Sequence, residues 1–270
     1  MTTWTAATKD DVIRVAHLAA DAAKEETLKP FRSADLSPEN KDASGFDPVT
    51  AADRAAELAI REILKRERPQ DAILGEEFGS SEGESGLTWV LDPIDGTRGY
   101  ISGTPTWGTL ISVADETGPK FGIIDQPYIG ERFSGGLGNA SMTGPLGQSS
   151  LNTRQGRTLA EATLLTTFPE IGTRRERQGF EAVEHHVKLT RYGMDCYGYA
   201  LLSAGQVDLV IEAGLHAYDI QAPIAVIEAA GGLVTDWSGA PAHEGGRVLA
   251  AANADLHAAA LAILCDFSDD

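Results

Sequence analysis

Residues 89–109, WVLDPIDGTRGYISGTPTWGT, constrain the fold of this chain more than any other segment. The first three residues are apolar, which is typical of a buried strand. Pro93 and Gly96 break regular structure, so a turn is expected directly after that strand. The turn delivers Asp92 and Asp95 to the carboxyl end of the strand, where open α/β sheets bind their ligands.

The residue types in this block favour a metal ion and a phosphate as ligands. Two carboxylates on a rigid turn offer oxygen atoms alone, which suit a hard cation such as Mg²⁺. The backbone N–H groups of Gly96 and Thr97 stand at an expected helix start and can hold a phosphate. An Asx-turn would explain Asp92 or Asp95 alone, but not both of them beside Thr97. The main hypothesis is therefore a site that binds a metal ion and a phosphate group together.

The charge of the chain limits its partners. The 270 residues carry a formal charge of −18, whereas nucleic-acid binding needs clustered Lys and Arg. A phosphorylated substrate would need bound divalent cations that make the local charge of its site positive. Most of the acidic residues are expected only to keep the protein soluble. No apolar run approaches the roughly 20 residues that a bilayer requires, so no membrane partner is expected. Cys196 and Cys265 form no disulfide framework and no zinc spacing, which favours a cytoplasmic protein.

Hydrophobic periodicity predicts two long helices in the first part of the chain. They lie at residues 9–29, opened by a capping box of Thr8 and Asp11, and at residues 50–68. The polar stretch between them, residues 31–46, is expected to be a mobile surface loop.

The rest of the chain alternates in a way that predicts a layered α/β arrangement. Loop formers at residues 144–155 mark a boundary between an N-terminal α+β half, residues 1–145, and a C-terminal α/β half, residues 146–270. Strands are expected at 72–74, 109–113, 121–124, 132–133, 163–167, 207–211 and 233–235, and helices at 197–204 and 220–230.

Three further acidic positions each have a structural explanation beside a functional one. Asp53 follows Thr50 at capping distance and could simply stabilise a helix start. Glu76 lies in a Gly-Glu-Glu sequence, which is common in a chain with 40 acidic residues. Asp219 precedes an apolar helix and could be its N-cap.

The order of these motifs is more specific than any one of them. They are DPVTAAD at 47–53, GEE at 75–77, WVLDPIDGT at 89–97, and YD at 218–219 before an apolar helix that ends in Gly-Gly. This order resembles the inositol monophosphatase superfamily, a group of Mg²⁺-dependent, lithium-sensitive phosphatases of sugars and small molecules. The resemblance extends over about residues 16–264. It implies an α/β (α+β) fold, the layered α-β-α-β-α sandwich of the inositol monophosphatase and fructose-bisphosphatase type.

The resemblance also implies which residues bind metal. Glu76, Asp92 and the carbonyl group of Ile94 look like the ligands of one Mg²⁺. Asp92, Asp95 and Asp219 look like the ligands of a second, and a weaker third ion would use Glu76 and waters. Two or three ions in each active site are therefore expected.

The catalytic roles follow from the same resemblance. Thr97 and Asp53 match the pair that orients and deprotonates the attacking water, and Glu76 is expected as the third catalytic residue. The backbone at Gly96 and Thr97 would hold the phosphate. The implied reaction is hydrolysis of a phosphomonoester by a water that the metals activate, in which positioning and electrostatics carry most of the rate.

Within the superfamily, residues 98–112, 125–133 and 191–214 look most like the histidinol-phosphate phosphatase branch. Histidinol carries an ammonium group and an imidazole, so its pocket should offer carboxylates. Asp195 and Glu212 are the candidates that could reach a crevice bounded by Asp219, although Asp195 could instead cap the helix that follows. The full set of expected substrate contacts is Asp95, Gly96, Thr97, Asp195, Glu212 and Asp219.

Two kinds of alternative stay open. The substrate could be an inositol phosphate or a 3′-phosphorylated nucleotide, as in bisphosphate nucleotidases of the same superfamily. From another class, the chain could be a metal-binding regulatory protein without turnover, but Thr97 and Asp53 are both present and favour an enzyme. The resemblance also implies a homodimer that takes part in histidine biosynthesis.

Overall fold

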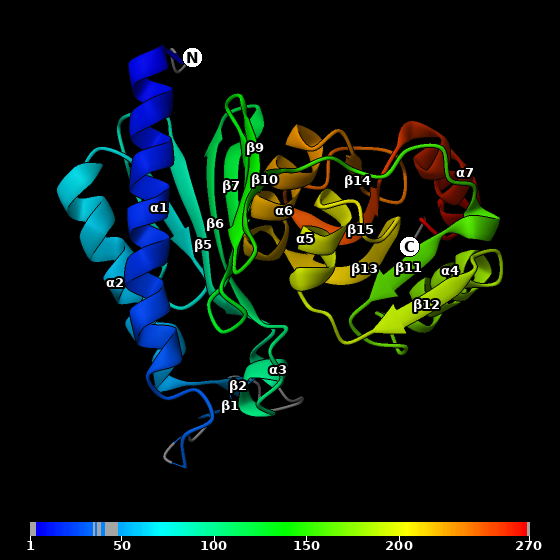
Figure 1. Ribbon diagram of the computed structural model, residues 1–270, viewed down its shortest axis with the longest axis horizontal. Coiled ribbons are helices and arrows are strands. Elements are labelled where there is room, and N and C mark those ends of the chain that lie inside the picture. Colours follow the sequence, from blue (N-terminus) through cyan, green and yellow to red (C-terminus); the bar gives the residue numbers. More distant parts are fainter. Residues whose placement is uncertain (1–3, 35, 37–38, 41–47, 269–270) are drawn as a thin grey trace.

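The computed structural model describes residues 4–34, 36, 39–40 and 48–268, which form five layers in the order α-β-α-β-α (Figure 1). Two helices cover the outer face of one sheet, two lie between the sheets, and two cover the outer face of the second sheet. This architecture confirms the expected layered α/β fold. Within these ranges no helix combines the length and the apolarity that crossing a membrane requires.

The first sheet has eight strands, and two helices pack on its outer face. The helices are α1 (Ala6–Leu28) and α2 (Ala51–Glu67). The strands are β3 (Ala72–Gly75), β4 (Gly79–Ser81), β5 (Thr88–Asp95), β6 (Gly108–Asp115), β7 (Gly118–Gln126), β8 (Glu131–Gly136), β9 (Asn139–Gly144) and β10 (Gly147–Ser150). They lie in the order β10-β9-β8-β7-β6-β5-β3-β4, with β3 and β5 parallel. Val15, Ile60 and Trp89 are in the core between these helices and the sheet.

The second sheet has five strands and lies between two pairs of helices. Its strands are β11 (Thr163–Thr166), β12 (Leu189–Tyr192), β13 (Leu209–His216), β14 (Leu233–Thr235) and β15 (Gly245–Ala251), in the order β12-β11-β13-β15-β14. The central helices are α5 (Tyr197–Ser203) and α6 (Ala217–Ala229), and the outer ones are α4 (Arg174–Glu184) and α7 (Ala254–Leu264). The smaller elements are α3 (Thr97–Ile101), the two-stranded pair β1 (Glu39–Asn40) and β2 (Pro48–Val49), and the 3-10 turns η1 (Leu159–Glu161) and η2 (Cys265–Phe267).

Helix α1 begins earlier than the sequence predicts. The expected capping box of Thr8 and Asp11 is wrong, because Thr5 is the N-cap and its hydroxyl accepts from the Thr8 N–H at 3.1 Å. Asp11 instead pairs with Arg14 at 2.7 Å. Most of the expected loop at 31–46, and Asp47 of the DPVTAAD motif, lie outside the described residues.

Helix α2 begins as its sequence predicts. Thr50 is the N-cap, and its backbone N–H and hydroxyl donate to Asp53 Oδ2 at 2.8 and 2.6 Å. The capping box therefore fixes the orientation of Asp53, which is buried. The capping explanation of this residue is confirmed, and it leaves the other carboxylate oxygen available for a second role.

The structure also differs from the predicted elements at residues 144–150, in β5 and in several elements that were not predicted. Residues 144–150, expected as part of a boundary loop, complete the hairpin of β9 and β10 at the edge of the first sheet. Strand β5 continues through Asp95 instead of ending before Asp92. Helices α4 and α7 and strands β4, β9, β12 and β15 were not among the predicted elements. The division at residues 145–146 stays a prediction.

Candidate active site

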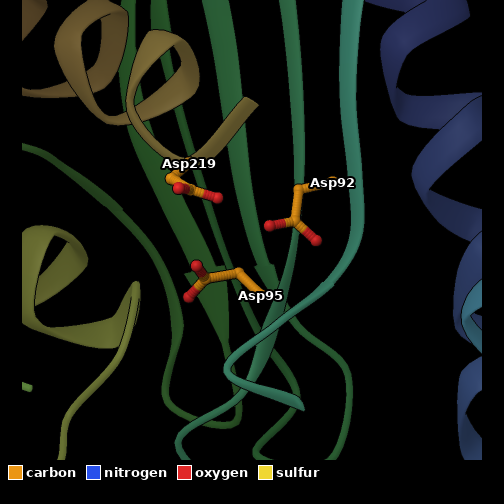
Figure 2. A group of neighbouring side chains, drawn as sticks. All are labelled: Asp92, Asp95 and Asp219. Carbon is orange, nitrogen blue, oxygen red and sulfur yellow. The ribbon is translucent and has the colours of Figure 1, made fainter. Parts of the chain in front are cut away.

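Three aspartates from two distant parts of the chain meet between the sheets. Asp92 and Asp95 lie on β5, and Asp219 lies in the first turn of α6. Figure 2 shows their carboxylates pointing toward one common space. One oxygen atom from each lies within 4.8 Å of the others, which is close enough for a single ion to contact all three.

A bulge in β5 places the first two aspartates side by side. Asp92 is opposite Leu110 and Asp95 is opposite Gly108, so three steps along β5 match two steps along β6. The hydroxyl of Thr109, between those partners, donates to the Pro93 carbonyl at 2.8 Å and holds the bulge. Pro93 is compatible with this position because a bulge relieves it of donating to the ladder. The expected turn after the strand is thus a bulge within it, and bulges often aim side chains at active sites.

The electrostatics of this trio favour a bound cation. Burial, followed by the neighbouring charges of Glu76, Asp95 and Asp219, raises the pKa of Asp92 well above its ordinary value. Burial and Asp219 raise the pKa of Asp95 in the same way. Asp92 Oδ1 is buried and has no hydrogen-bond partner among the described residues. A divalent cation would remove the repulsion and give this oxygen a partner, and an all-oxygen donor set fits Mg²⁺.

Two predicted metal ligands adjoin the trio. The Glu76 N–H donates to the carbonyl of Leu91, the neighbour of Asp92 in β5, and the charge of Glu76 helps to raise the pKa of Asp92. The Ile94 carbonyl accepts from the Thr97 hydroxyl at 3.0 Å, which leaves one of its lone pairs for another partner. The roles of Glu76 and Ile94 as ligands stay predictions.

The predicted water-activating pair lies beside the aspartates. The Thr97 hydroxyl is 3.5 Å from Asp53 Oδ1, on the oxygen that the capping box does not use. Burial raises the pKa of Asp53 to about 6, while the hydrogen bonds from Thr50 oppose that rise. A carboxylate with this pKa can accept a proton near neutral pH and release it again.

The turn between β5 and α3 brings backbone donors to the site. Gly96 is the N-cap of α3 and has a φ of 83°, in the left-handed region that favours glycine. Its missing side chain matters for a second reason, because a Cβ atom there would lie 2.6 Å from the carboxyl carbon of Asp195. Glycine thus lets the turn and Asp195 approach one another closely.

A cavity of about 300 Å³ opens beside the trio and contains the predicted substrate contacts. Both halves of the chain line it, the first with residues of the β5–α3 turn and the second with residues near α5 and β13. Its lining residues include Asp95, Gly96, Thr97, Asp195, Glu212 and Asp219.

The two predicted substrate carboxylates are anchored by hydroxyl and amide groups. Asp195 Oδ2 accepts from the Thr106 hydroxyl at 2.8 Å. Asp195 has a φ of 47°, and Cys196 is the N-cap of α5, so the capping explanation of Asp195 is wrong. Glu212 accepts from the Thr166 hydroxyl at 3.0 Å and from the Thr167 N–H at 2.6 Å.

Four lining or supporting residues were missed by sequence reasoning. Thr106 holds Asp195, Arg98 stacks its guanidinium 5.1 Å from the ring centre of Phe168 at the cavity wall, and the buried Tyr199 lines the cavity from α5. Arg98 alone has a local signal, its position directly after Gly-Thr. The other three gain their places through contacts between distant segments, which no local pattern marks.

Comparison with known proteins agrees with this geometry. The model of the inositol monophosphatase family matches residues 8–268. A chloroplastic bifunctional phosphatase of Arabidopsis thaliana is 40% identical, over 93% of this chain and 74% of its own length. A histidinol-phosphatase of Streptomyces coelicolor is 37% identical, over 92% of this chain and 94% of its own length.

The solved structures agree as well. An inositol monophosphatase from Zymomonas mobilis has a TM-score of 0.84 and 39% identity, over 97% of this chain and 99% of that chain. The match of the family model extends from α1 to η2 and includes every residue of the site. This chain is a member of the inositol monophosphatase family of phosphatases.

Proposed function

We propose that this chain is a Mg²⁺-dependent phosphomonoesterase that hydrolyses histidinol phosphate to histidinol and phosphate. The observation that carries the proposal is the pair Asp195 and Glu212. Glu212 is buried and Asp195 is half-buried in the wall of the cavity that contains Asp95, Asp219 and the Gly96 turn.

The metal part of the proposal rests on the carboxylates. Phosphatases of this family are metal-dependent and generally use Mg²⁺. In this chain Asp92, Asp95 and Asp219 would hold the ion, with Glu76 beside Asp92. Bound there, Mg²⁺ supplies a Lewis acid and compensates the negative charge of the phosphate.

The remaining work falls to residues of the turn and of α2. Thr97 orients the attacking water through its hydroxyl, and Asp53 accepts the proton through the oxygen nearest to Thr97. The N–H groups at the start of α3 hold the phosphate oxygens. These groups are positioned before the substrate arrives, so little reorganisation accompanies the reaction.

The organic part of the substrate is matched by charge. Among the described residues, neither Asp195 nor Glu212 forms an ion pair with Lys or Arg. Two carboxylates with little access to water and no cationic partner favour a ligand that brings positive charge, as the ammonium and imidazolium groups of histidinol do. The similarity to histidinol-phosphatases supports the same substrate.

Inositol monophosphate is the second candidate, because the solved relative from Zymomonas mobilis is an inositol monophosphatase at 39% identity. Its neutral hydroxyl groups could accept and donate hydrogen bonds, but they would leave the two carboxylates uncompensated. We also propose that the protein is a cytoplasmic homodimer that takes part in histidine biosynthesis.

A side-by-side assay tests the substrate. We expect kcat/KM for histidinol phosphate to exceed that for inositol 1-phosphate and adenosine 3′,5′-bisphosphate by at least about tenfold, since one charged hydrogen bond contributes about 1.5–3 kcal/mol. Each rate is measured with Mg²⁺ and after exhaustive chelation. A preference for inositol 1-phosphate would refute the substrate, and full activity without metal would refute the metal chemistry.

The variant Asp195→Asn sharpens this assay. Asparagine tolerates the left-handed backbone at position 195 and can still accept from Thr106, so the change removes mainly the charge. We expect the ratio of kcat/KM for histidinol phosphate to kcat/KM for inositol 1-phosphate to fall roughly tenfold or more, with turnover of inositol 1-phosphate unchanged or improved. An equal loss on both substrates would assign Asp195 to the architecture of the site instead.

The pKa of Glu212 predicts a pH dependence of stability in the metal-free protein. Burial raises that pKa from 4.5 to about 7. Because the folded pKa is the higher one, the contribution of this carboxyl to stability is complete below the unfolded pKa and is lost as the pH rises through about 7. We expect the melting temperature to fall between about pH 5 and about pH 8, and to fall less in Glu212→Gln. If the melting temperature fell equally with pH in the wild type and in Glu212→Gln, Glu212 would not be the cause of the pH dependence.

A further inference from the structure

A second buried carboxylate on α2 lies outside the set of ligands and catalytic groups described above. Glu57 is one helical turn after Asp53, and its side chain is 0% exposed. It faces the tight turn between β3 and β4, which contains Glu76. A carboxylate removed from water in this way must be compensated by several donors.

The donors come from the turn and from the helix itself. Glu57 Oε2 accepts from the Glu77 N–H at 2.7 Å, and Oε1 accepts from the Phe78 N–H at 3.3 Å. Arg61 Nε donates to Oε1 at 2.8 Å, and another nitrogen of Arg61 donates to the Gly79 carbonyl. The turn is therefore tied to α2 at three consecutive residues after Glu76.

The opposite side of the turn is fixed by β5. The Glu76 N–H donates to the Leu91 carbonyl at 3.2 Å, next to Asp92 in the chain. Gly75 lets Glu57 approach, because a Cβ atom at position 75 would lie 2.0 Å from Glu57 Oε1. Glycine in the Gly-Glu-Glu sequence is thus required by the carboxylate behind it.

We propose that Glu57 is a positioning residue that fixes the 75–79 turn so that Glu76 meets the cation held by Asp92. The inference rests on the proposed metal site, and Glu57 belongs neither to the aspartate trio nor to the cavity lining. Helix α2 then positions two groups of the site, because it carries Asp53 directly and orients Glu76 through Glu57. Groups that support metal ligands in this way typically change metal affinity about 10–100-fold when they are replaced.

Binding of Mn²⁺ to the metal-free protein, followed by electron paramagnetic resonance, tests this role without an activity assay. In Glu57→Gln one carboxylate oxygen becomes an NH2 group, which faces either the Glu77 N–H or the Phe78 N–H and Arg61, so the turn loses part of its anchor in both orientations. We expect the Kd of Mn²⁺ to rise at least about tenfold. Glu62→Gln, on the exposed side of the same helix, is the matched control and should bind as the wild type does.

Two comparisons separate positioning from a merely structural role. Ile60→Val in the core of α2 should lower the melting temperature and leave the Kd unchanged. The double variant Glu57→Gln/Glu76→Gln should bind no more weakly than Glu76→Gln alone, because Glu57 acts through Glu76. Additive losses, or a Glu57→Gln protein that melts earlier with wild-type affinity, would overturn the inference.

Two further outcomes are informative. If Glu57→Gln does not fold, Arg61→Met tests the same role, since it removes the hydrogen bonds from Arg61 to Glu57 and to the Gly79 carbonyl near the surface. We expect this variant to raise the Kd of Mn²⁺ severalfold. Wild-type affinity in Arg61→Met would overturn the inference. If the wild-type protein binds no Mn²⁺, the proposed metal site fails instead.

Discussion

Replacing Asp92 with asparagine should abolish most of the phosphatase activity. Asp92 is grouped with Asp95 and Asp219, and the charge of Glu76 also acts on it. Loss of a single oxyanion donor already costs about 10²–10³ in kcat in well-studied enzymes, and a shared metal ligand should cost at least about 10³. Steady-state rates over a wide range of Mg²⁺ concentration measure the loss.

The stability of the same variant provides a second readout. Burial and neighbouring carboxylates raise the pKa of Asp92, so the folded protein disfavours ionisation of this carboxyl, and the metal-free wild type loses stability at this position as the pH rises above the ordinary pKa of 3.8. Metal-free Asp92→Asn should therefore melt at a higher temperature than the metal-free wild type and gain little from added Mg²⁺. Asp255→Asn, at an exposed site on α7, is the control and should match the wild type. Turnover within tenfold of the wild type would exclude Asp92 as a shared ligand.

Replacing Thr97 with alanine should slow the chemical step and leave metal binding nearly intact. Its hydroxyl lies between the Ile94 carbonyl at 3.0 Å and Asp53 at 3.5 Å, where it can orient a water. Positioned proton transfer contributes about 10²–10⁴-fold, so kcat should fall by roughly that factor. Single-turnover rates at saturating Mg²⁺, together with Mn²⁺ affinity, separate the two effects.

The conservative change Thr97→Ser is the control for this prediction. Serine keeps the hydroxyl and loses a methyl group, so most of the rate should return. If Thr97→Ala lost its metal and kept its turnover at saturating Mg²⁺, the pair formed with Asp53 would be assigned wrongly.

The parts of the site that sequence predicted are those encoded in short segments. Asp92, Asp95, Gly96 and Thr97 lie within six residues, and their types alone indicate a metal and a phosphate. The capping box at Thr50 is equally local. The layered fold followed from alternating periodicity and from the resemblance to the inositol monophosphatase superfamily.

The parts that sequence did not predict depend on contacts between distant segments. Thr106 reaches Asp195 across 89 positions, and Glu57 reaches Glu77 across 20. Neither contact leaves a periodic pattern, because a single threonine or a helical glutamate is more often at the surface. The bulge in β5 was missed for a similar reason, since only the pairing with β6 shows that one residue is extra.

The position of α6 has a mechanical consequence. This helix packs against β6, β7 and β8 of the first sheet and against β13, β14 and β15 of the second, and residues 220–227 are buried along its length. Asp219 at its start meets two aspartates of β5, so a cation bound by all three would act as a cross-link between the layers. Such a ligand binds the native state alone and adds about 2.7 kcal/mol of stability at a concentration 100 times its Kd. Sliding of one sheet over the other would separate these oxygens, and the rigidity of the sandwich therefore sets the affinity for metal.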